Sequence, residues 1–87
     1  MEKAILIRTD GSEEKLCPKD GKKFSLKELQ GFVKGYIELA ITKDNKDMYV
    51  NEEGKINGSI PNEKATKIYK YNQDDVIYGD VVVIEKK

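Results

Sequence analysis

The chain of 87 residues has no histidine and a single cysteine, Cys17. Without an imidazole it cannot build the nucleophile–histidine pairs of serine and cysteine hydrolases, and nothing of that kind activates Cys17. The usual zinc sites are excluded as well, because they draw on several cysteine and histidine ligands. A lone cysteine makes no intrachain disulfide, which is typical of a reducing compartment. We therefore expect no catalytic residues, no bound metal, no cofactor, and a protein that is not an enzyme.

An excess of charge of one sign is also missing, because 16 basic and 16 acidic residues cancel. Non-specific nucleic-acid binding relies on a basic surface and is not expected. Arg8 is the only arginine, so the chain has one side chain able to grip a phosphate in a bidentate manner. No apolar run approaches the length of a membrane span, and the N-terminus lacks the apolar core of a signal peptide. We expect no membrane association and a cytoplasmic location.

The first part of the chain has the alternating pattern of a β-hairpin. Lys3–Thr9 and Glu13–Cys17 are predicted as strands. Residues of Lys3–Thr9 are apolar on both faces, which favours a central position in a sheet. Asp10-Gly11 between the two strands is typical of a tight primed turn, which requires positive φ.

A helix over about 26–34 follows this hairpin. Ser25 is its predicted N-cap, and Glu28 three residues later completes a capping box. Gly35 is a natural residue for ending the helix. One helical face carries the apolar side chains that should pack on a sheet: Leu26, Leu29, Phe32 and Val33.

A second hairpin is predicted after the helix. Tyr36–Thr42 alternates, and its apolar members Ile37, Leu39 and Ile41 are expected to face the core. Met48–Val50 is the return strand, and Lys55-Ile56 resumes it briefly after a turn.

The last third of the chain supplies a short helix and a final strand. Asn62 is the predicted N-cap of a helix over about 63–69. Val81–Ile84 is apolar on both faces and should lie in the middle of a sheet. The whole pattern predicts one domain over residues 1–87 with an α+β fold. It has one mostly antiparallel sheet of four to six strands, with the main helix (about 26–34) and the short helix (about 63–69) covering one face.

Five short pieces of the chain keep a characteristic order and spacing. They are Leu29-Gln30 followed by Val33, Gly35-Tyr36-Ile37-Glu38, Asn51-Glu52-Glu53-Gly54-Lys55, Asn62 with Ala65-Thr66, and Gly79-Asp80-Val81-Val82-Val83. In combination they resemble the domain-of-unknown-function family 3846. The resemblance implies a setting in bacteriophages, plasmids and other mobile elements and in their bacterial hosts, and it brings no established catalytic residue or ligand. The family commonly has two glycines before the tyrosine. Lys34 takes the place of the first one here, which leaves open how the helix ends.

Polar residues on these pieces make up a candidate ligand-binding site. If they converge between the main helix and the second hairpin, their amides and carboxylates and a tyrosine would read the base and ribose of a nucleotide. Tyr69, Tyr71 and Tyr78 would add a stacking surface. The alternative is a local structural role for each, such as a turn or cap for the asparagines. The candidate residues are Gln30, Tyr36, Glu38, Asn51, Glu52, Asn62, Thr66 and Asp80.

The leading hypothesis is a small non-enzymatic binding protein of phage or mobile-element origin that modulates a process of its bacterial host. It would act in anti-defence, by sequestering a nucleotide-derived signal or by binding a host protein. The alternative is a structural or regulatory homo-oligomeric interaction module with no small-molecule ligand. Exposed strand edges would then pair with a second copy in a homodimer or higher homo-oligomer. A third hypothesis is a metal-dependent phosphodiesterase that uses Glu38, Glu52 or Asp80.

Overall fold

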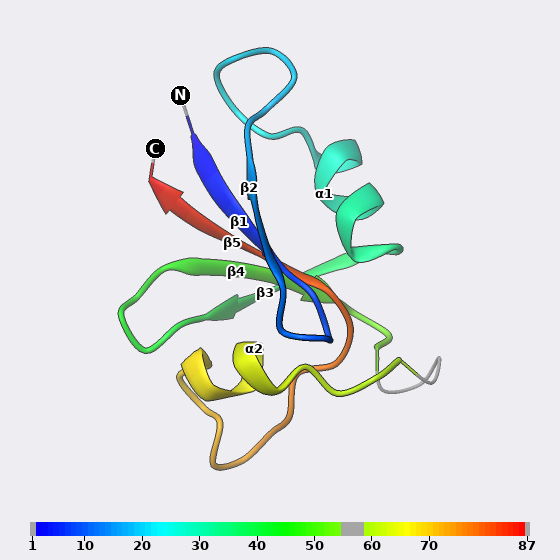
Figure 1. The fold of residues 1–87 in the computed structure, drawn as a ribbon, viewed down its shortest axis with the longest axis vertical. Helices are drawn as coiled ribbons and strands as arrows, with labels where there is room; N and C mark the ends of the chain where they lie inside the picture. Colours follow the sequence, from blue (N-terminus) through cyan, green and yellow to red (C-terminus); the bar gives the residue numbers. More distant parts are fainter. Residues whose placement is uncertain (1, 55–58, 87) are drawn as a thin grey trace.

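The computed structural model describes residues 2–54 and 59–86, apart from the side chain of Lys86. Within these residues, five strands form one antiparallel sheet in the order β2-β1-β5-β4-β3 (Figure 1). The prediction of an α+β fold with a sheet of four to six strands and one main helix is confirmed. The predicted continuation at Lys55-Ile56 lies outside the described residues. The elements are β1 (Lys3–Ile7), β2 (Glu13–Leu16), α1 (Leu26–Val33), β3 (Ile37–Ile41), β4 (Asp47–Asn51), α2 (Glu63–Ile68) and β5 (Val81–Lys86).

The last strand of the chain, β5, lies in the middle of the sheet. It pairs with β1 on one side and with β4 on the other, and so joins the two hairpins. All four residues from Val81 to Ile84 are buried, as expected for a strand that is covered on both faces. The predicted central position of this strand, and that of β1 beside it, is confirmed.

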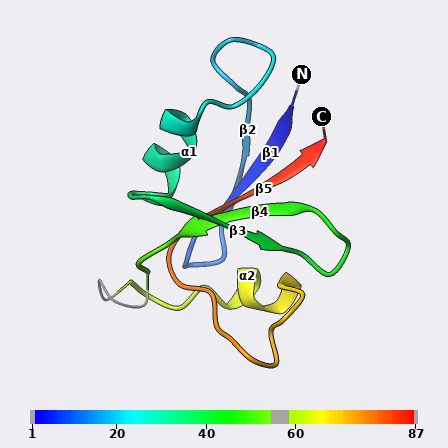
Figure 2. The ribbon, with the colours of Figure 1, turned by 180° about the vertical axis from the view of Figure 1, so that it is seen from behind.

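The two helices lie on opposite faces of the sheet (Figures 1 and 2). On one face, Val82 belongs to the same hydrophobic cluster as Leu29 and Val33 of α1. On the other face, Val81 belongs to a second cluster, together with Ala65 of α2. The prediction that both helices cover one face is therefore wrong. The physical reason is that successive residues of the central strands point to opposite faces of the sheet and are apolar on both faces. Each face therefore needs a helix to cover it.

The first hairpin closes through three residues rather than two. The backbone N–H of Arg8 donates to the carbonyl of Ser12 at 2.9 Å, and Gly11 has a φ of 89°. Asp10 is not among the residues with positive φ, so the predicted primed turn at Asp10-Gly11 is wrong. Asn45 takes the same left-handed role in the β3–β4 turn, with a φ of 66°. Glycine and asparagine adopt this region at the smallest steric cost.

The helix α1 starts as predicted but ends differently. The Ser25 hydroxyl accepts a hydrogen bond from the Glu28 N–H at 3.1 Å, and the Glu28 carboxylate accepts one from the Ser25 N–H at 2.9 Å. This confirms the capping box. The left-handed residue at the other end is Lys34, with a φ of 65°, and not the predicted Gly35. Lys34 thus takes the conformation that a glycine at this position would adopt freely.

The edge strand β3 is buried mainly on the face opposite to the predicted one. Ala40 and Thr42 are buried against the α2 side, whereas Leu39 is 52% exposed. Ile37 and Ile41 are only half-buried. The prediction that these three apolar residues face the core is therefore correct for Ile37, which packs against the α1-side cluster, and wrong for Leu39. The reason is that β3 is the outermost strand of the sheet on this side, where α1 covers only part of the face.

The short helix α2 begins at the predicted N-cap. The side-chain oxygen of Asn62 accepts a hydrogen bond from the Ala65 N–H at 3.0 Å, and the helix ends at Ile68. In the described part of the chain, no helix has the length and apolar character to cross a membrane.

Candidate functional site

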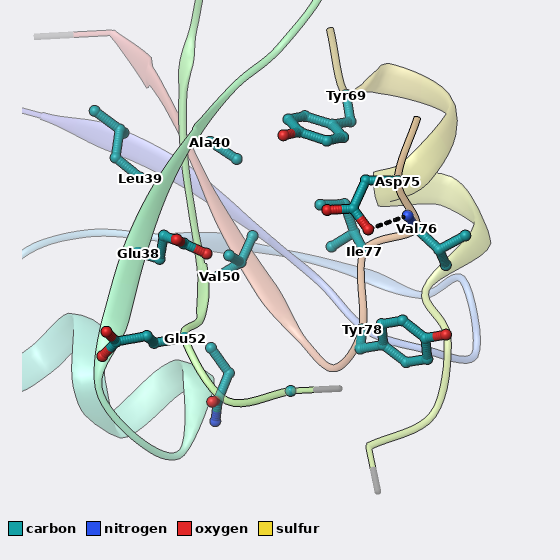
Figure 3. Close-up of a pocket in the computed structure, with 12 residues that line it drawn as sticks. Glu38, Leu39, Ala40, Val50, Glu52, Tyr69, Asp75, Val76, Ile77 and Tyr78 are labelled. Carbon is teal, nitrogen blue, oxygen red and sulfur yellow. Dashed lines mark hydrogen bonds between the residues drawn. The ribbon is translucent and has the colours of Figure 1, made fainter. Parts of the chain in front are cut away.

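A pocket of about 320 Å³ opens on the α2 face, between the β3–β4 hairpin and residues 75–78 (Figure 3). We call it the hairpin pocket. Its floor contains the buried side chains of Ala40, Val50 and Ile77. The full set of described lining residues is Glu38, Leu39, Ala40, Val50, Asn51, Glu52, Gly54, Tyr69, Asp75, Val76, Ile77 and Tyr78.

The described lining residues of the hairpin pocket carry acidic groups and no basic one. Glu38 and Glu52 come from the two sides of the hairpin, and Asp75 comes from the facing segment. The Asp75 carboxylate also accepts a hydrogen bond from the Val76 N–H at 2.8 Å, which Figure 3 marks with a dashed line. Carboxylates around a pocket with an apolar floor and no basic group favour a cationic group and repel a phosphate.

Two tyrosines line the opposite wall of the pocket. Tyr69 and Tyr78 are both half-buried, and each presents an aromatic ring. Tyr71 does not line the pocket. It lies 53% exposed and packs edge-on against Tyr69, with 5.8 Å between ring centroids. Of the three tyrosines that were expected to add a stacking surface, two line the pocket and the third packs against one of them.

The wall at residues 75–78 is held by Thr66 and Asn62. The Thr66 hydroxyl accepts a hydrogen bond from the Ile77 N–H at 2.9 Å, and the Asn62 N–H donates to the Ile77 carbonyl at 2.8 Å. At the other end, a Cβ atom on Gly54 would come within 3.2 Å of Tyr78, so glycine permits this close approach. This wall of the pocket is thus held in place by hydrogen bonds to α2 and to its N-cap residue.

Asn62 has a structural role and no surface of its own. It is 0% exposed. Its Nδ2 donates to the carbonyls of Ile7 at 3.0 Å and Gly79 at 2.9 Å, while its oxygen caps α2. Every hydrogen-bonding atom of this amide faces a protein partner, so Asn62 ties α2 to the ends of β1 and β5. Thr66 is similar, since its hydroxyl donates to the Asn62 carbonyl at 2.8 Å.

Asn51 lies where three hollows meet. Its Nδ2 donates to the Val33 carbonyl at 3.1 Å, and its Oδ1 accepts from the Glu53 N–H at 2.8 Å. The residue lines the hairpin pocket and also two shallower hollows beside α1. Its amide therefore serves first as a cap for the last turn of α1.

The eight candidate residues do not form one cleft. Glu38, Asn51 and Glu52 line the hairpin pocket. Gln30 and Tyr36 line a hollow at the C-terminal end of α1, with Asn51 as the shared member.

Asp80 and the two α2-side polar residues lie elsewhere. Asp80 lines a third hollow, where its carboxylate accepts a hydrogen bond from the Thr9 N–H at 3.1 Å. Asn62 and Thr66 stand behind the pocket wall rather than in it. Sequence reasoning did not identify Ile77 or Asp75 as pocket residues. The position of Ile77 depends on hydrogen bonds to Thr66 and Asn62 that no local pattern shows.

A second concavity of about 410 Å³ lies between α2, β1 and the β3–β4 turn. We call it the lysine groove. Its apolar floor includes Ile5, Ile7 and Val83. Its described lining residues are Ile5, Ile7, Glu13, Thr42, Lys43, Asp44, Lys46, Lys64, Lys67, Ile68, Val83 and Glu85.

Two of the lysines in the groove are engaged in ion pairs. Lys64 lies 2.8 Å from the carboxylate of Glu13. Lys46 lies 2.9 Å from that of Glu85, and this hydrogen bond, assisted by Asp44, raises the pKa of the Lys46 ammonium. Lys43 and Lys67 are the other two lysines, and both are exposed.

Groups of histidine, cysteine, aspartate or glutamate that would hold a metal ion are not found in the part of the chain that the structure describes. The carboxylates proposed for a phosphodiesterase are also divided, with Glu38 and Glu52 at the hairpin pocket and Asp80 at another hollow.

Comparison with known proteins gives one assignment. No curated protein and no solved structure matches the chain. A family model described as a domain of unknown function (DUF3846) matches residues 1–87. Since that match spans the whole sequence, including the first hairpin, the chain belongs to the DUF3846 family.

Proposed function

We propose that this chain is a small non-enzymatic binding protein of phage or mobile-element origin that modulates a process of its bacterial host, in anti-defence. It acts by binding a host protein through the hairpin pocket. The observation that supports this best is the chemistry of the pocket, where Glu38 and Glu52 rim an apolar floor beside two tyrosines. A lysine or arginine side chain fits such a surface, with its stem on the floor and its cation at the carboxylates and rings.

A charge reversal in the pocket tests this function. The tagged chain is expressed in its bacterial host and co-purifying proteins are identified for the wild type, Glu38→Lys and Glu63→Lys. Glu63 makes the same change of charge on α2 outside the described lining of the pocket. We expect one defined partner to be kept by the wild type and by Glu63→Lys and lost by Glu38→Lys. Equal retention by Glu38→Lys would remove the pocket as the binding surface.

The genes beside the coding sequence test the proposed setting. Early phage genes with anti-defence neighbours are expected. A consistent position among replication or conjugation genes would contradict the anti-defence role while leaving a binding function in place.

A second candidate function is sequestration of a nucleotide-derived signal, and one observation favours it. The lysine groove combines an apolar floor with the exposed cations Lys43 and Lys67. An apolar floor accepts a base, and lysines attract phosphate as point charges. The hairpin pocket, with its carboxylates, is the poorer place for such a ligand.

Thermal unfolding in the presence of nucleotides tests the second candidate. Cyclic dinucleotides, cyclic ADP-ribose isomers and common nucleotides are added, because a ligand that binds only the folded state raises the Tm. We expect this rise in Tm to be lost in the double variant Lys43→Ala/Lys67→Ala. It should be kept in Lys27→Ala, which changes an exposed lysine on α1. No rise with any nucleotide removes this candidate and leaves the binding of a host protein.

A further inference from the structure

The outer edge of β3 has backbone groups that no described strand uses. In the described sheet β3 is an end strand and pairs only with β4. The Glu52 N–H donates to the Tyr36 carbonyl at 2.9 Å. Because the backbone N–H and C=O groups of successive residues point to opposite sides of a strand, those of Glu38 and Ala40 also point toward β4. The N–H and C=O groups of Ile37 and Leu39 consequently point away from the sheet.

The rest of this edge is already covered. The Lys70 N–H donates to the Ile41 carbonyl at 2.9 Å, and the Lys43 N–H donates to the Ile68 carbonyl at 2.8 Å. An added strand therefore has room only beside Ile37 and Leu39, with Glu38 between them.

The opposite edge of the sheet is different in kind. The exposed residues of β2 are Glu13, Glu14 and Lys15, which is a common protection against strand pairing. On β3, by contrast, Leu39 is 52% exposed. The β2 edge thus has three exposed charged residues, whereas the open part of the β3 edge has one, Glu38, between the apolar residues Ile37 and Leu39.

The side chain between the two free positions determines the partner. Glu38 lies on the α2 face and lines the hairpin pocket, whereas Leu39 lies on the α1 face. In an antiparallel addition, the residue opposite Glu38 has its Cβ within about 5.5 Å of that of Glu38. A basic residue there is attracted and reaches the acidic rim, and apolar neighbours cover Leu39.

We infer that β3 accepts an extended segment of the partner protein by strand addition, and that this segment has the pattern apolar–basic–apolar. The backbone of the apolar residues pairs with Ile37 and Leu39, and the basic side chain enters the hairpin pocket beside Glu38. This inference rests on the proposed binding of a host protein, and it specifies the chemistry of the segment through which that partner binds.

A second copy of this chain is a poor occupant of the same edge. The antiparallel self-pairing that uses both Ile37 and Leu39 places Glu38 opposite Glu38 of the other copy. Like charges directly opposite each other destabilise a strand pair. A register centred on Leu39 instead requires the carbonyl of Ile41, which already accepts from Lys70.

Peptides titrated into the isotope-labelled full chain test the inference by amide NMR shifts. The probe is the blocked peptide Thr-Val-Arg-Val-Thr, compared with Thr-Val-Glu-Val-Thr and with the arginine peptide N-methylated at both valines. We expect the arginine peptide to shift the amides of Ile37 and Leu39, and the glutamate peptide to bind roughly fivefold more weakly. The N-methylated peptide should not bind, because it lacks the donors for the edge.

Two variants make the test specific. Glu38→Lys should reverse the preference in favour of the glutamate peptide, whereas Glu63→Lys should leave it unchanged. An unchanged preference in Glu38→Lys, binding of the N-methylated peptide, or concentration-dependent shifts of Ile37 and Leu39 without peptide would each overturn the inference.

The two proposals fail separately. If the peptides do not bind while a host partner still depends on Glu38 in co-purification, only the strand addition is wrong. If no host partner depends on Glu38 and the peptides bind as expected, β3 accepts an added strand but the proposed function is wrong.

Discussion

The Nδ2 atom of Asn51 lies 2.8 Å from the position that a Cβ atom on Gly35 would occupy. From there the amide donates to the carbonyls of Val33 at 3.1 Å and Lys34 at 3.4 Å, which belong to the end of α1. The last residue of β4 therefore caps a helix that ended 18 residues earlier in the chain. Only a residue without a side chain at position 35 lets the asparagine approach so closely.

The first prediction concerns this contact. Gly35→Ala should lower the free energy of unfolding by about 1–3 kcal/mol, because the added methyl group displaces the Asn51 amide from the helix end. Chemical denaturation measures the change. Gly31→Ala is the matched control, since a Cβ there meets nothing within 4 Å. It should instead raise the stability by roughly 0.5–1 kcal/mol, as alanine does inside a helix. Equal effects of both substitutions would contradict the role of Gly35.

The second prediction concerns the left-handed end of α1. Lys34 has a φ of 65°, a conformation that costs a residue with a side chain about 1 kcal/mol. Lys34→Gly should therefore stabilise the protein by about that amount in thermal or chemical unfolding. Lys27→Gly, inside the same helix, should destabilise it by about 1 kcal/mol. If Lys34→Gly is also destabilising, the helix does not end as described.

Sequence reasoning succeeded where a feature depends on neighbours in the chain. The capping box at Ser25, the N-cap at Asn62 and the central strand at Val81–Ile84 each follow from a few adjacent residues. The end of α1 was less clear, because Lys34 is in a conformation that its residue type does not favour.

The site was harder to predict because its members meet through long-range packing. Asn51 looks like a turn residue in the sequence, and its bond to Val33 depends on how β4 lies against α1. Likewise, apolar residues on both sides of β1 and β5 show that two faces need covering, but not which helix covers which. The number and type of elements could therefore be predicted, whereas the division of the eight polar residues among several hollows could not.

The third prediction concerns the buried amide of Asn62. Asn62→Asp keeps an oxygen to cap α2, but it replaces the donor that faces the carbonyls of Ile7 and Gly79 with a second acceptor. Position 62 is 0% exposed, and an ionised carboxylate there would face two carbonyl oxygens. It should lower the free energy of unfolding by more than the roughly 1–3 kcal/mol that a buried unsatisfied polar group costs. Chemical denaturation at neutral pH should show Asn62→Asp to be less stable than Asn62→Ala. The reverse order would mean that the donor side of the amide contributes little.

The fourth prediction concerns pH. Hydrogen bonds from the backbone N–H groups of Ser25 and Lys19 lower the pKa of Glu28 below its ordinary value of 4.5. The unfolded chain then binds more protons than the folded one in this range. The contribution of Glu28 is therefore complete above pH 4.5 and is lost as the pH falls through the lower folded pKa. Glu28→Gln keeps an acceptor for the cap but does not titrate. Its unfolding free energy, measured from about pH 6 to about pH 3, should fall less steeply than that of the wild type. Parallel curves for Glu28→Gln and the wild type would show that the capping carboxylate is not part of the acid response.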